Sequence, residues 1–252
     1  MAEWRPDAGL CVPVLNERDS LPSLLREIAD ALAGADYTVC VVDDGSTDGS
    51  AELVRAAAER DRRVVLLERR TKGSGCLRGA ATRAGLEWLL AHTRHRVLVD
   101  FDADGSNLPS ELEAGIRQVD LLGSDAAIAS KYVPGSRVLG RPLGRRLASR
   151  AYNLALRLLM EPRIRDYSNS YRFYSRKAAD LLLRFPAGYE SPVYLVEMLA
   201  VWLANGLNVA ELPTVYGDRR GGASKVVSLD FLRGLAGALS VGLAYRTGRY
   251  RL

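Results

Sequence analysis

Cysteine, histidine and lysine are scarce in this chain. Of its 252 residues, three are cysteines, two are histidines and four are lysines, whereas arginine supplies the rest of the 35 basic residues. Three cysteines are too few for a disulfide framework, and Cys11 and Cys40 fall inside apolar runs, where a free thiol acts as a small hydrophobic side chain. We therefore expect a reducing compartment and a cytoplasmic protein.

Long apolar runs are also missing. A membrane-spanning helix needs roughly 18 consecutive apolar residues, and Glu197 and Arg233 interrupt the two longest runs. The amino end carries Glu3, Arg5 and Asp7 and has no apolar run before a small-residue cleavage site, which predicts no signal peptide. We expect a protein that is soluble or peripheral at a membrane face.

Motifs for covalent hydrolysis are absent as well. The sequence shows no Ser/His/Asp or Cys/His arrangement and no CxxC metal site. His92 and His95 follow a predicted helix in a polar turn, where we expect them to be solvated.

What the chain does have is the pattern of an α/β protein, with 48% hydrophobic and 26% charged residues. Short β-branched runs alternate with helical patterns, which predicts βαβ units and a mostly parallel central sheet flanked by helices. The expected strands are 9–15, 37–43, 63–67, 96–101 and 126–130, and the helices are 21–32, 50–60 with Ser50 as N-cap, 75–91 and 110–122.

The second half has more helix, at 141–160, 178–183, 192–204 and 229–246, with strands at 171–174 and 207–216. Because no linker or repeat divides the chain, we expect one domain over 1–252, in which 226–252 is a C-terminal amphipathic helix.

Positive charge is concentrated in one segment. Residues 131–176 contain eleven Lys or Arg against two acidic residues, although the whole chain has a net charge of only +5. Such a segment suits phosphates in a site or an anionic membrane, and the simpler alternative is a solvated helical face.

Acidic and polar groups follow three of the expected strands. Asn16 and Glu17 follow the first, Asp43 and Asp44 end the second, and 102–104 (Asp-Ala-Asp) follows the fourth. In an open parallel sheet, ligands bind at the carboxyl ends of the strands. Carboxylate oxygens favour Mg²⁺ or Mn²⁺, which in turn suits a nucleotide diphosphate. Acidic caps on successive helices are the simpler alternative.

A calcium loop competes for the same residues. Asp100, Asp102, Asp104, Gly105 and Glu111 match the D-x-D-x-D-G-x5-E pattern of an EF-hand. An EF-hand needs a helix before its loop, however, whereas the apolar residues of 96–99 predict a buried strand. This context argues against a calcium loop.

The motifs resemble those of a known family. Pro13-x-Leu15-Asn16-Glu17, the segment 42–49 (VDDGSTDG) and Asp102-Ala103-Asp104 are similar to successive motifs of family-2 glycosyltransferases, which have the GT-A (Rossmann-like) fold. Four later segments resemble dolichol-phosphate mannose synthases and other polyprenyl-phosphate glycosyltransferases: 129–133 (ASKYV), Arg146-x-x-Ser149-x-x-x-Asn153, Asp166-x-Ser168-x-x-x-Arg172 and Arg219-x-x-Gly222-x-Ser224-Lys225.

The resemblance implies a role for each matching residue. The base and ribose of a GDP- or UDP-sugar would be held by Pro13, Leu15, Glu17, Val42 and Asp44. The diphosphate and its Mg²⁺ or Mn²⁺ would be held by 102–104 (Asp-Ala-Asp) together with Ser106, with Asp102, Asp104 and Ser106 as metal ligands. The phosphates of donor or acceptor would be faced by Lys131, Arg146, Arg219 and Lys225. The catalytic set is then Asp102, Asp104, Lys131, Arg146 and Arg219.

These roles describe a metal-dependent, inverting enzyme that moves a mannose- or glucose-type hexose from a nucleotide diphosphate sugar to a polyprenyl phosphate, without nucleic acid as a partner. One alternative is transfer to a hydroxyl of a small metabolite or glycan, which would need a carboxylate base such as Asp166. If the acceptor is a polyprenyl phosphate, we expect Asp166 to form an ion pair with an arginine such as Arg172. A third alternative is a noncatalytic nucleotide-sugar or calcium-binding protein.

Two helices offer apolar stripes for a membrane surface. The first stripe is Leu143, Leu147, Ala151, Leu154 and Leu158, and the second is Phe231, Leu235, Leu239 and Tyr245. Both could lie in a lipid headgroup layer, or they could pack on the core.

Overall fold

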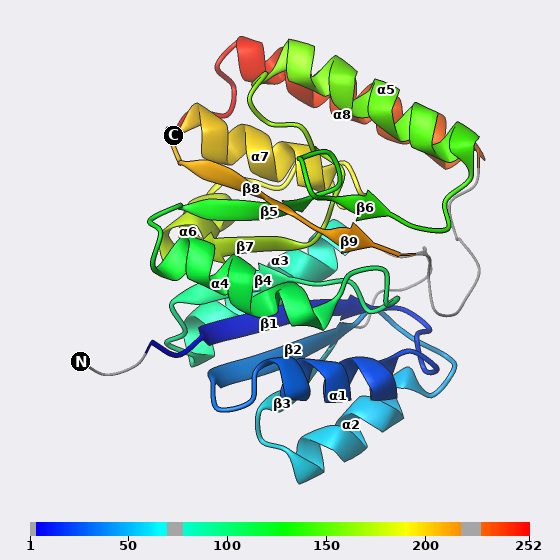
Figure 1. Ribbon diagram of the computed structural model, residues 1–252, viewed down its shortest axis with the longest axis vertical. Helices are drawn as coiled ribbons and strands as arrows, with labels where there is room; N and C mark the ends of the chain where they lie inside the picture. Colours follow the sequence, from blue (N-terminus) through cyan, green and yellow to red (C-terminus); the bar gives the residue numbers. More distant parts are fainter. Residues whose placement is uncertain (1–3, 70–77, 218–227) are drawn as a thin grey trace.

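The described residues build a main sheet of seven strands, drawn in Figure 1. A computed structural model of the chain describes residues 4–69, 78–217 and 228–252, and of 228–232 it describes the backbone alone. The strand order is β3-β2-β1-β4-β7-β5-β8, in which only β7 runs antiparallel to its neighbours. The bounds are β1 (Asp7–Val14), β2 (Asp36–Asp43), β3 (Val64–Glu68), β4 (Val97–Asp100), β5 (Ala126–Ser130), β7 (Arg172–Ser175) and β8 (Val209–Pro213). The predicted α/β class with a mostly parallel sheet is confirmed.

Helices cover both faces of this sheet. One face packs against α1 (Leu21–Ala31), α2 (Ser50–Arg60) and α4 (Leu112–Asp120), which follows the 3₁₀ turn η1 (Pro109–Glu111). The other face packs against α3 (Arg78–His92), α6 (Arg176–Arg184) and α7 (Tyr194–Ala204). Two further helices, α5 (Leu143–Leu159) and α8 (Ser228–Arg246), lie side by side at one end of the molecule, where α8 also packs on α7 (Figure 1).

The strand pleat sorts the apolar side chains between two cores. In β1, Leu10 and Val12 join the core on the α1 side, whereas Cys11 joins the core on the α3 side. Gly85 lets α3 approach closely, because a Cβ there would lie 2.4 Å from the Cys11 sulfur. Cys11 and Cys40 are free and buried, as the sequence predicts. Together these contacts fix α3 against β1 and β2.

Some local expectations were wrong. The N-cap of α2 is Gly49, at φ 90°, and not Ser50. The Ser50 hydroxyl instead accepts from the Glu17 N–H and donates to Asp48 Oδ1. The expected strand 207–216 is divided at Thr214, because β9 (Val215–Tyr216) leaves the main sheet to pair with the unpredicted β6 (Arg137–Val138).

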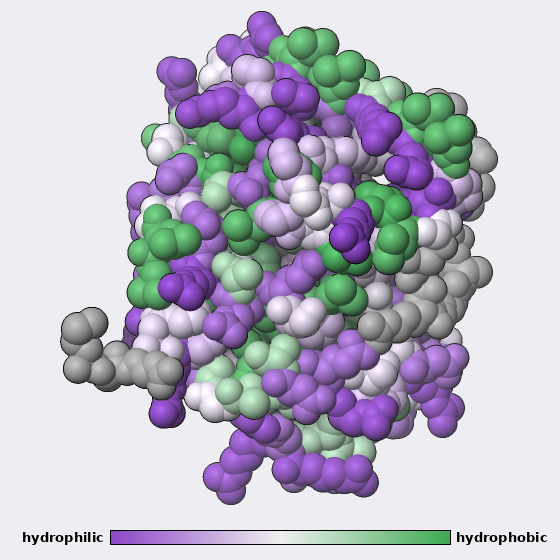
Figure 2. All heavy atoms as spheres, viewed as in Figure 1, coloured by the Kyte–Doolittle hydropathy of each residue, from purple (hydrophilic) through white to green (hydrophobic). Residues whose placement is uncertain are grey.

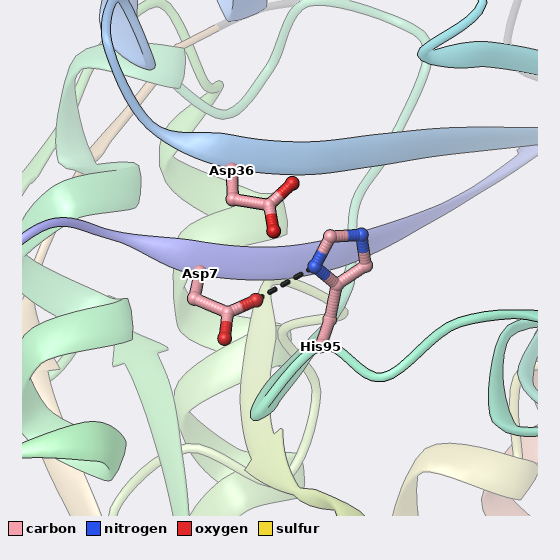
Figure 3. Close-up of side chains that lie close together, drawn as sticks. All are labelled: Asp7, Asp36 and His95. Carbon is pink, nitrogen blue, oxygen red and sulfur yellow. Dashed lines mark hydrogen bonds and ion pairs between the residues drawn. The ribbon is translucent and has the colours of Figure 1, made fainter.

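His95 is buried and bonded, contrary to the expectation that it is solvated. Its Nδ1 lies 2.7 Å from Asp7 Oδ1 (Figure 3). Its Nε2 lies 2.9 Å from Thr38 Oγ1. With Asp36, these side chains form a group whose ligand atoms lie within 4.8 Å of one another. The group stands where β1 and β2 begin, at the sheet edge opposite the strand ends that carry the acidic motifs. Both ring nitrogens of His95 already have partners, one in β1 and one in β2. We therefore interpret the group as a structural contact that holds the two strands together.

Across the described part of the chain, no helix combines the length and apolarity needed to cross a bilayer. Four leucines of α5 are nevertheless more than half exposed: Leu143, Leu147, Leu154 and Leu158. In the upper part of Figure 2, over α5, hydrophobic groups alternate with hydrophilic ones. The α5 stripe that the sequence predicts therefore faces outward and not into the core.

Candidate active site

The loops after β1 and β2 interlock at the carboxyl edge of the sheet. The Asn16 N–H donates to Ser46 Oγ and the Thr47 N–H donates to Asn16 Oδ1, both at 2.8 Å. Asn16 has φ 54°, a left-handed conformation that Asn tolerates better than most residues. The two motifs that resemble a nucleotide site therefore form one structural unit.

Within this unit the predicted nucleotide residues differ in what they can offer. Pro13 and Val42 are buried in paired strands, and Val42 packs beneath α3, so its side chain is not available to a ligand. Leu15 and Glu17 are partly exposed just beyond β1. The Asp44 carboxylate forms an ion pair of 2.7 Å with Arg69, a residue that the sequence patterns did not single out.

Asp102 and Asp104 follow β4 at the same edge, next to the end of β1. Asp104 Oδ1 accepts the Ser106 N–H at 2.9 Å, and Ser106 is buried beneath it. The Asp102 carboxylate accepts from Asn107 Nδ2 at 3.3 Å and from the Ser170 hydroxyl. The structure thus places Asp102, Asp104 and Ser106, the three residues that the family resemblance groups, in one turn, with Ala103 buried between the aspartates.

This turn has the donor chemistry that a hard cation prefers. Asp102 and Asp104 supply carboxylate oxygens, which suit Mg²⁺ and Mn²⁺. Asn107 is fully buried, and its Oδ1 has no hydrogen-bond partner among the described residues. A buried oxygen without a partner is costly unless a ligand or water satisfies it. The residues present therefore fit a divalent cation.

The geometry excludes the calcium loop. Asp100 is fully buried and bonded to Arg78 and Tyr194, and Glu111 accepts from Thr214 Oγ1 and the Val215 N–H. An EF-hand needs both carboxylates on the ion and a helix before the loop, whereas here the loop follows β4.

Arg78, the first residue of α3, is a site residue that the sequence analysis missed. Its Nη2 donates to Asp100 Oδ1 at 3.0 Å, its Nη1 pairs with Asp102 Oδ1, and its Nε donates to the Tyr194 hydroxyl at 3.1 Å. Burial alone would lower the pKa of Arg78, but Asp102, Tyr194 and Asp100 outweigh it and raise the pKa. A permanent cation therefore lies beside the Asp-Ala-Asp turn.

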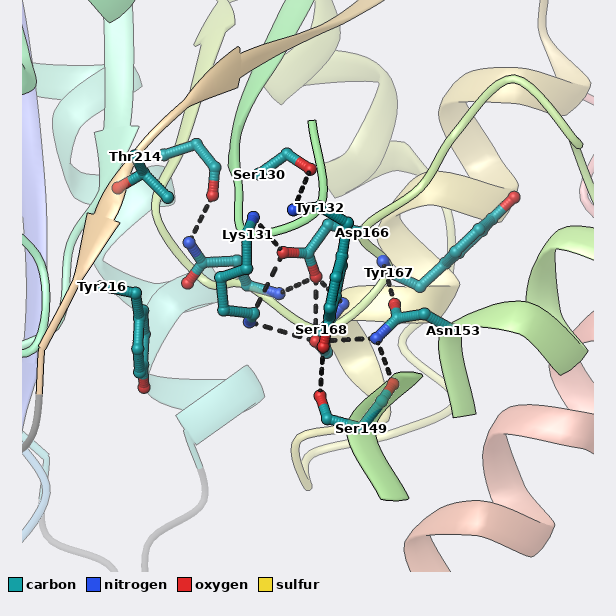
Figure 4. Close-up of polar contacts among 12 residues, drawn as sticks. Ser130, Lys131, Tyr132, Ser149, Asn153, Asp166, Tyr167, Ser168, Thr214 and Tyr216 are labelled. Atoms are coloured by element: carbon teal, nitrogen blue, oxygen red, sulfur yellow. Dashed lines mark hydrogen bonds and ion pairs between the residues drawn. The ribbon is translucent and has the colours of Figure 1, made fainter. Parts of the chain in front are cut away.

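A second buried ion pair lies at the carboxyl end of β5 (Figure 4). Lys131 Nζ is 3.5 Å from Asp166 Oδ2 and donates to Ser168 Oγ at 3.1 Å. Asp166 is fully buried and accepts the N–H groups of Lys131, Ser168 and Asn169. Burial by itself would raise the pKa of Asp166, but Lys131 and the backbone donors outweigh it, so the pKa is lowered.

The expected pairing of Asp166 with Arg172 was wrong. Arg172 is buried and donates to three carbonyl oxygens, those of Asn169, Leu195 and Tyr167. Its role is to tie β7 to the neighbouring loop and to α7.

Next to this pair, basic side chains line a small pocket between β6 and α5. Its lining includes Lys131, Arg141, Arg146, Arg150 and Ser149. The Arg141 guanidinium lies over the Tyr216 ring, 4.5 Å from its centroid, and donates to the Tyr216 hydroxyl at 2.8 Å. Arg146 is exposed, whereas the Lys131 ammonium is buried against Asp166. The predicted residues Arg219 and Lys225 lie outside the described residues.

Comparison with known proteins identifies the family. Residues 10–183 match the model of the family described as glycosyl transferase family 2. A polyprenol monophosphomannose synthase of Mycolicibacterium smegmatis is 34% identical over 242 residues, covering 95% of this chain and 88% of the relative. An undecaprenyl-phosphate mannosyltransferase of Micrococcus luteus is 33% identical over 218 residues, covering 85% of each.

Solved structures support the fold. Crystal structures of glucosyl-3-phosphoglycerate synthase from Mycobacterium tuberculosis share 20% identity with this chain and superpose with a TM-score of 0.66 over 95% of it. The superpositions cover 78% and 79% of those chains. One of the two crystal structures contains UDP with Mn²⁺ and phosphoglyceric acid, and the other contains UDP with Mg²⁺. This likeness confirms the GT-A fold, and the match to the family model is the stronger finding about activity. The chain belongs to glycosyl transferase family 2 and is a glycosyltransferase.

Proposed function

We propose that this enzyme transfers a hexose of the mannose or glucose type from a nucleotide diphosphate sugar to a polyprenyl phosphate. The observation that carries the proposal is the pair of relatives above, both named for mannose and a polyprenyl acceptor and both alike along most of the chain. Mannose is accordingly the first sugar to test.

The basic pocket supports a phosphate acceptor. A phosphate monoester has its second pKa near ~6 and is largely dianionic at neutral pH, so it can attack without a general base. The exposed guanidinium of Arg146 and the neighbouring Arg141 and Arg150 supply cations for such a group. Asp166 is committed to Lys131 and to backbone N–H groups, which makes it a poor base for a hydroxyl acceptor.

The Asp-Ala-Asp turn supports the donor side. Asp102, Asp104 and Ser106 would hold Mg²⁺ or Mn²⁺, and the bound cation would neutralise charge on the departing nucleotide diphosphate. Leu15 and Glu17, together with Asp44 held by Arg69, would contact the base and ribose next to this turn. Inversion at the anomeric carbon follows if the acceptor attacks from the face opposite the diphosphate.

The experiment is a screen of GDP-mannose, UDP-glucose and other nucleotide sugars against a short polyprenyl phosphate with Mn²⁺ or Mg²⁺, in which mass spectrometry detects the product. We expect one donor to yield a hexosyl polyprenyl phosphate. If every donor fails on the lipid phosphate and one glycosylates a hydroxyl compound, the acceptor assignment is wrong. If a donor binds but no acceptor is ever glycosylated, the chain is a binding protein.

We further propose that α5 seats the enzyme on the anionic, cytoplasmic face of a membrane. Its exposed leucines, Leu143, Leu147, Leu154 and Leu158, stand among exposed arginines that include Arg145 and Arg150. An apolar stripe flanked by arginines matches an anionic headgroup layer, which attracts the cations and takes up the apolar side chains. The basic pocket lies beside the same helix, where a lipid phosphate would arrive.

Sedimentation with vesicles of anionic lipid at low and high salt tests this surface. We expect binding at low salt that weakens at high salt, and a large loss in the double variant Leu147→Ser/Leu154→Ser. Leu122→Ser is the matched control, because Leu122 is also exposed but follows α4. Absence of binding at low salt, or equal loss in the control, would remove α5 as the membrane surface.

A further inference from the structure

Arg78 is shared between two carboxylates that differ in their surroundings. Asp100 is fully buried, and its Oδ2 accepts the Tyr194 hydroxyl at 2.6 Å while its Oδ1 accepts from Arg78. Asp102, two residues further on, has a side chain that is 18% exposed and stands in the turn that fits a cation. Arg78 therefore has one enclosed partner and one partner that faces the site.

The buried part of this network is a set of three side chains that all bond one another. Arg78, Asp100 and Tyr194 form a ring in which Arg78 binds both other groups and these bind each other. Loss of the contact with Asp102 would leave Arg78 still bonded to Asp100 and to Tyr194. The guanidinium can thus release Asp102 without becoming a buried cation that lacks a counter-ion.

A divalent cation would compete with the present hydrogen-bond and ion-pair partners of Asp102. One oxygen of Asp102 is paired with Arg78, and the other accepts from Ser170 and Asn107. A divalent cation that takes Asp102 as a ligand through Oδ1 would share this oxygen with the guanidinium, and through Oδ2 it would compete with Ser170 and Asn107. Of the three, only the guanidinium also repels the cation electrostatically.

We propose that Arg78 is the counter-ion of Asp102 in the metal-free enzyme and yields this carboxylate when a divalent cation binds, while Asp100 and Tyr194 retain the guanidinium. Arg78 is in this sense a positioning residue that sets the cation affinity of the turn. The inference rests on the metal assignment in the proposed function.

The test is a titration with Mn²⁺ alone, without nucleotide, in which electron paramagnetic resonance measures the free ion. The variant is Arg78→Met/Asp100→Asn, which removes a cation and a buried anion together, so the core keeps its charge balance and the fold is expected to survive. We expect it to bind Mn²⁺ roughly tenfold more tightly than the parent, because the competing guanidinium is gone. The control is Asp100→Asn alone, which keeps Arg78 on Asp102 and should bind no more tightly than the parent.

The outcomes separate the inference from the proposed function. If the parent binds Mn²⁺ and the double variant binds it equally or less tightly, Arg78 does not compete with the ion, although the metal assignment stands. If Mn²⁺ affinity is unchanged but binding of GDP or UDP weakens, Arg78 is a phosphate ligand and the inference is overturned. If neither protein binds Mn²⁺, the metal assignment fails and the inference fails with it.

Discussion

Replacing Asp166 by Asn should cost stability more than chemistry. In the native state Asp166 Oδ1 accepts the Ser168 N–H, the Ser168 hydroxyl and the Asn169 N–H, whereas Oδ2 accepts the Lys131 N–H and faces the Lys131 ammonium. An Asn oxygen can keep the first set of bonds. Its NH₂ group then faces two donors of Lys131, and the buried ammonium loses its counter-ion.

The size of the effect follows from this loss. Breaking a buried ion pair by removing one partner costs about 3–5 kcal/mol of unfolding free energy. In a chain of this length each kcal/mol lowers Tm by about 2–4 °C, so we expect a fall of roughly 6–20 °C by calorimetry. The double variant Asp166→Asn/Lys131→Met should lose less than the sum of the two single variants, because both charges leave together.

The pH dependence has a defined sign. The pKa of Asp166 is lowered in the folded protein, so its contribution to the free energy of unfolding is complete above the unfolded value of about 3.9. It is lost as the pH falls through the folded pKa. The stability difference between parent and Asp166→Asn should therefore be largest near neutral pH and shrink in strong acid.

Activity decides between the two roles of Asp166. Below its unfolding midpoint, Asp166→Asn should retain measurable turnover on polyprenyl phosphate. A variant with the parental Tm and intact donor binding but no turnover would refute the reasoning, because it would make Asp166 a base for a hydroxyl acceptor.

Three further predictions concern the site and its support. Asp104→Asn removes an anionic ligand but keeps the size of the side chain, so turnover with Mn²⁺ should fall by orders of magnitude at an unchanged Tm, and a near-parental rate would refute the assignment. Arg146→Ala should raise the KM for the lipid phosphate sharply while calorimetric binding of the nucleotide sugar stays near parental, whereas equal losses for both would place Arg146 on the donor. Gly85→Ala, whose Cβ would meet the Cys11 sulfur, should lower the free energy of unfolding by about 1–3 kcal/mol in a urea titration, and a neutral effect would contradict the close packing of α3.

Periodicity predicted the sheet and its helices because their signals are local. The near-continuous apolar runs of β1 and β2, which are buried on both faces, and the helical spacing in α1 reflect burial, which dominates the placement of those segments. The ribbon of β6 and β9 was missed because a two-residue strand has no detectable period, and its pairing joins residues far apart in the sequence.

Within the site, the sequence predicted the acidic residues but not the arginines that contact the site residues. The acidic pair at 102–104 is recognisable by residue type and spacing, and the structure places it at the expected sheet edge. Arg78, Arg69 and Arg141 belong to an arginine-rich chain in which one guanidinium looks like another, and only tertiary contacts show which of them meet carboxylates or the Tyr216 ring. The expected ion pair between Asp166 and Arg172 was wrong for the same reason. The partner of Asp166 is Lys131, 35 residues earlier in the sequence, and only the fold brings the two together.

The central claim is that the acceptor is a lipid phosphate and not a hydroxyl. The most direct measurement offers the enzyme an equimolar mixture of a short polyprenyl phosphate and the polyprenol of the same chain length, with GDP-mannose or the best donor of the screen and Mn²⁺, and detects the products by mass. We predict a hexosyl polyprenyl phosphate and no glycosylated polyprenol, with product formation reduced in Arg146→Ala. Glycosylated polyprenol, or turnover on a hydroxyl compound with the lipid phosphate left unmodified, would contradict the account.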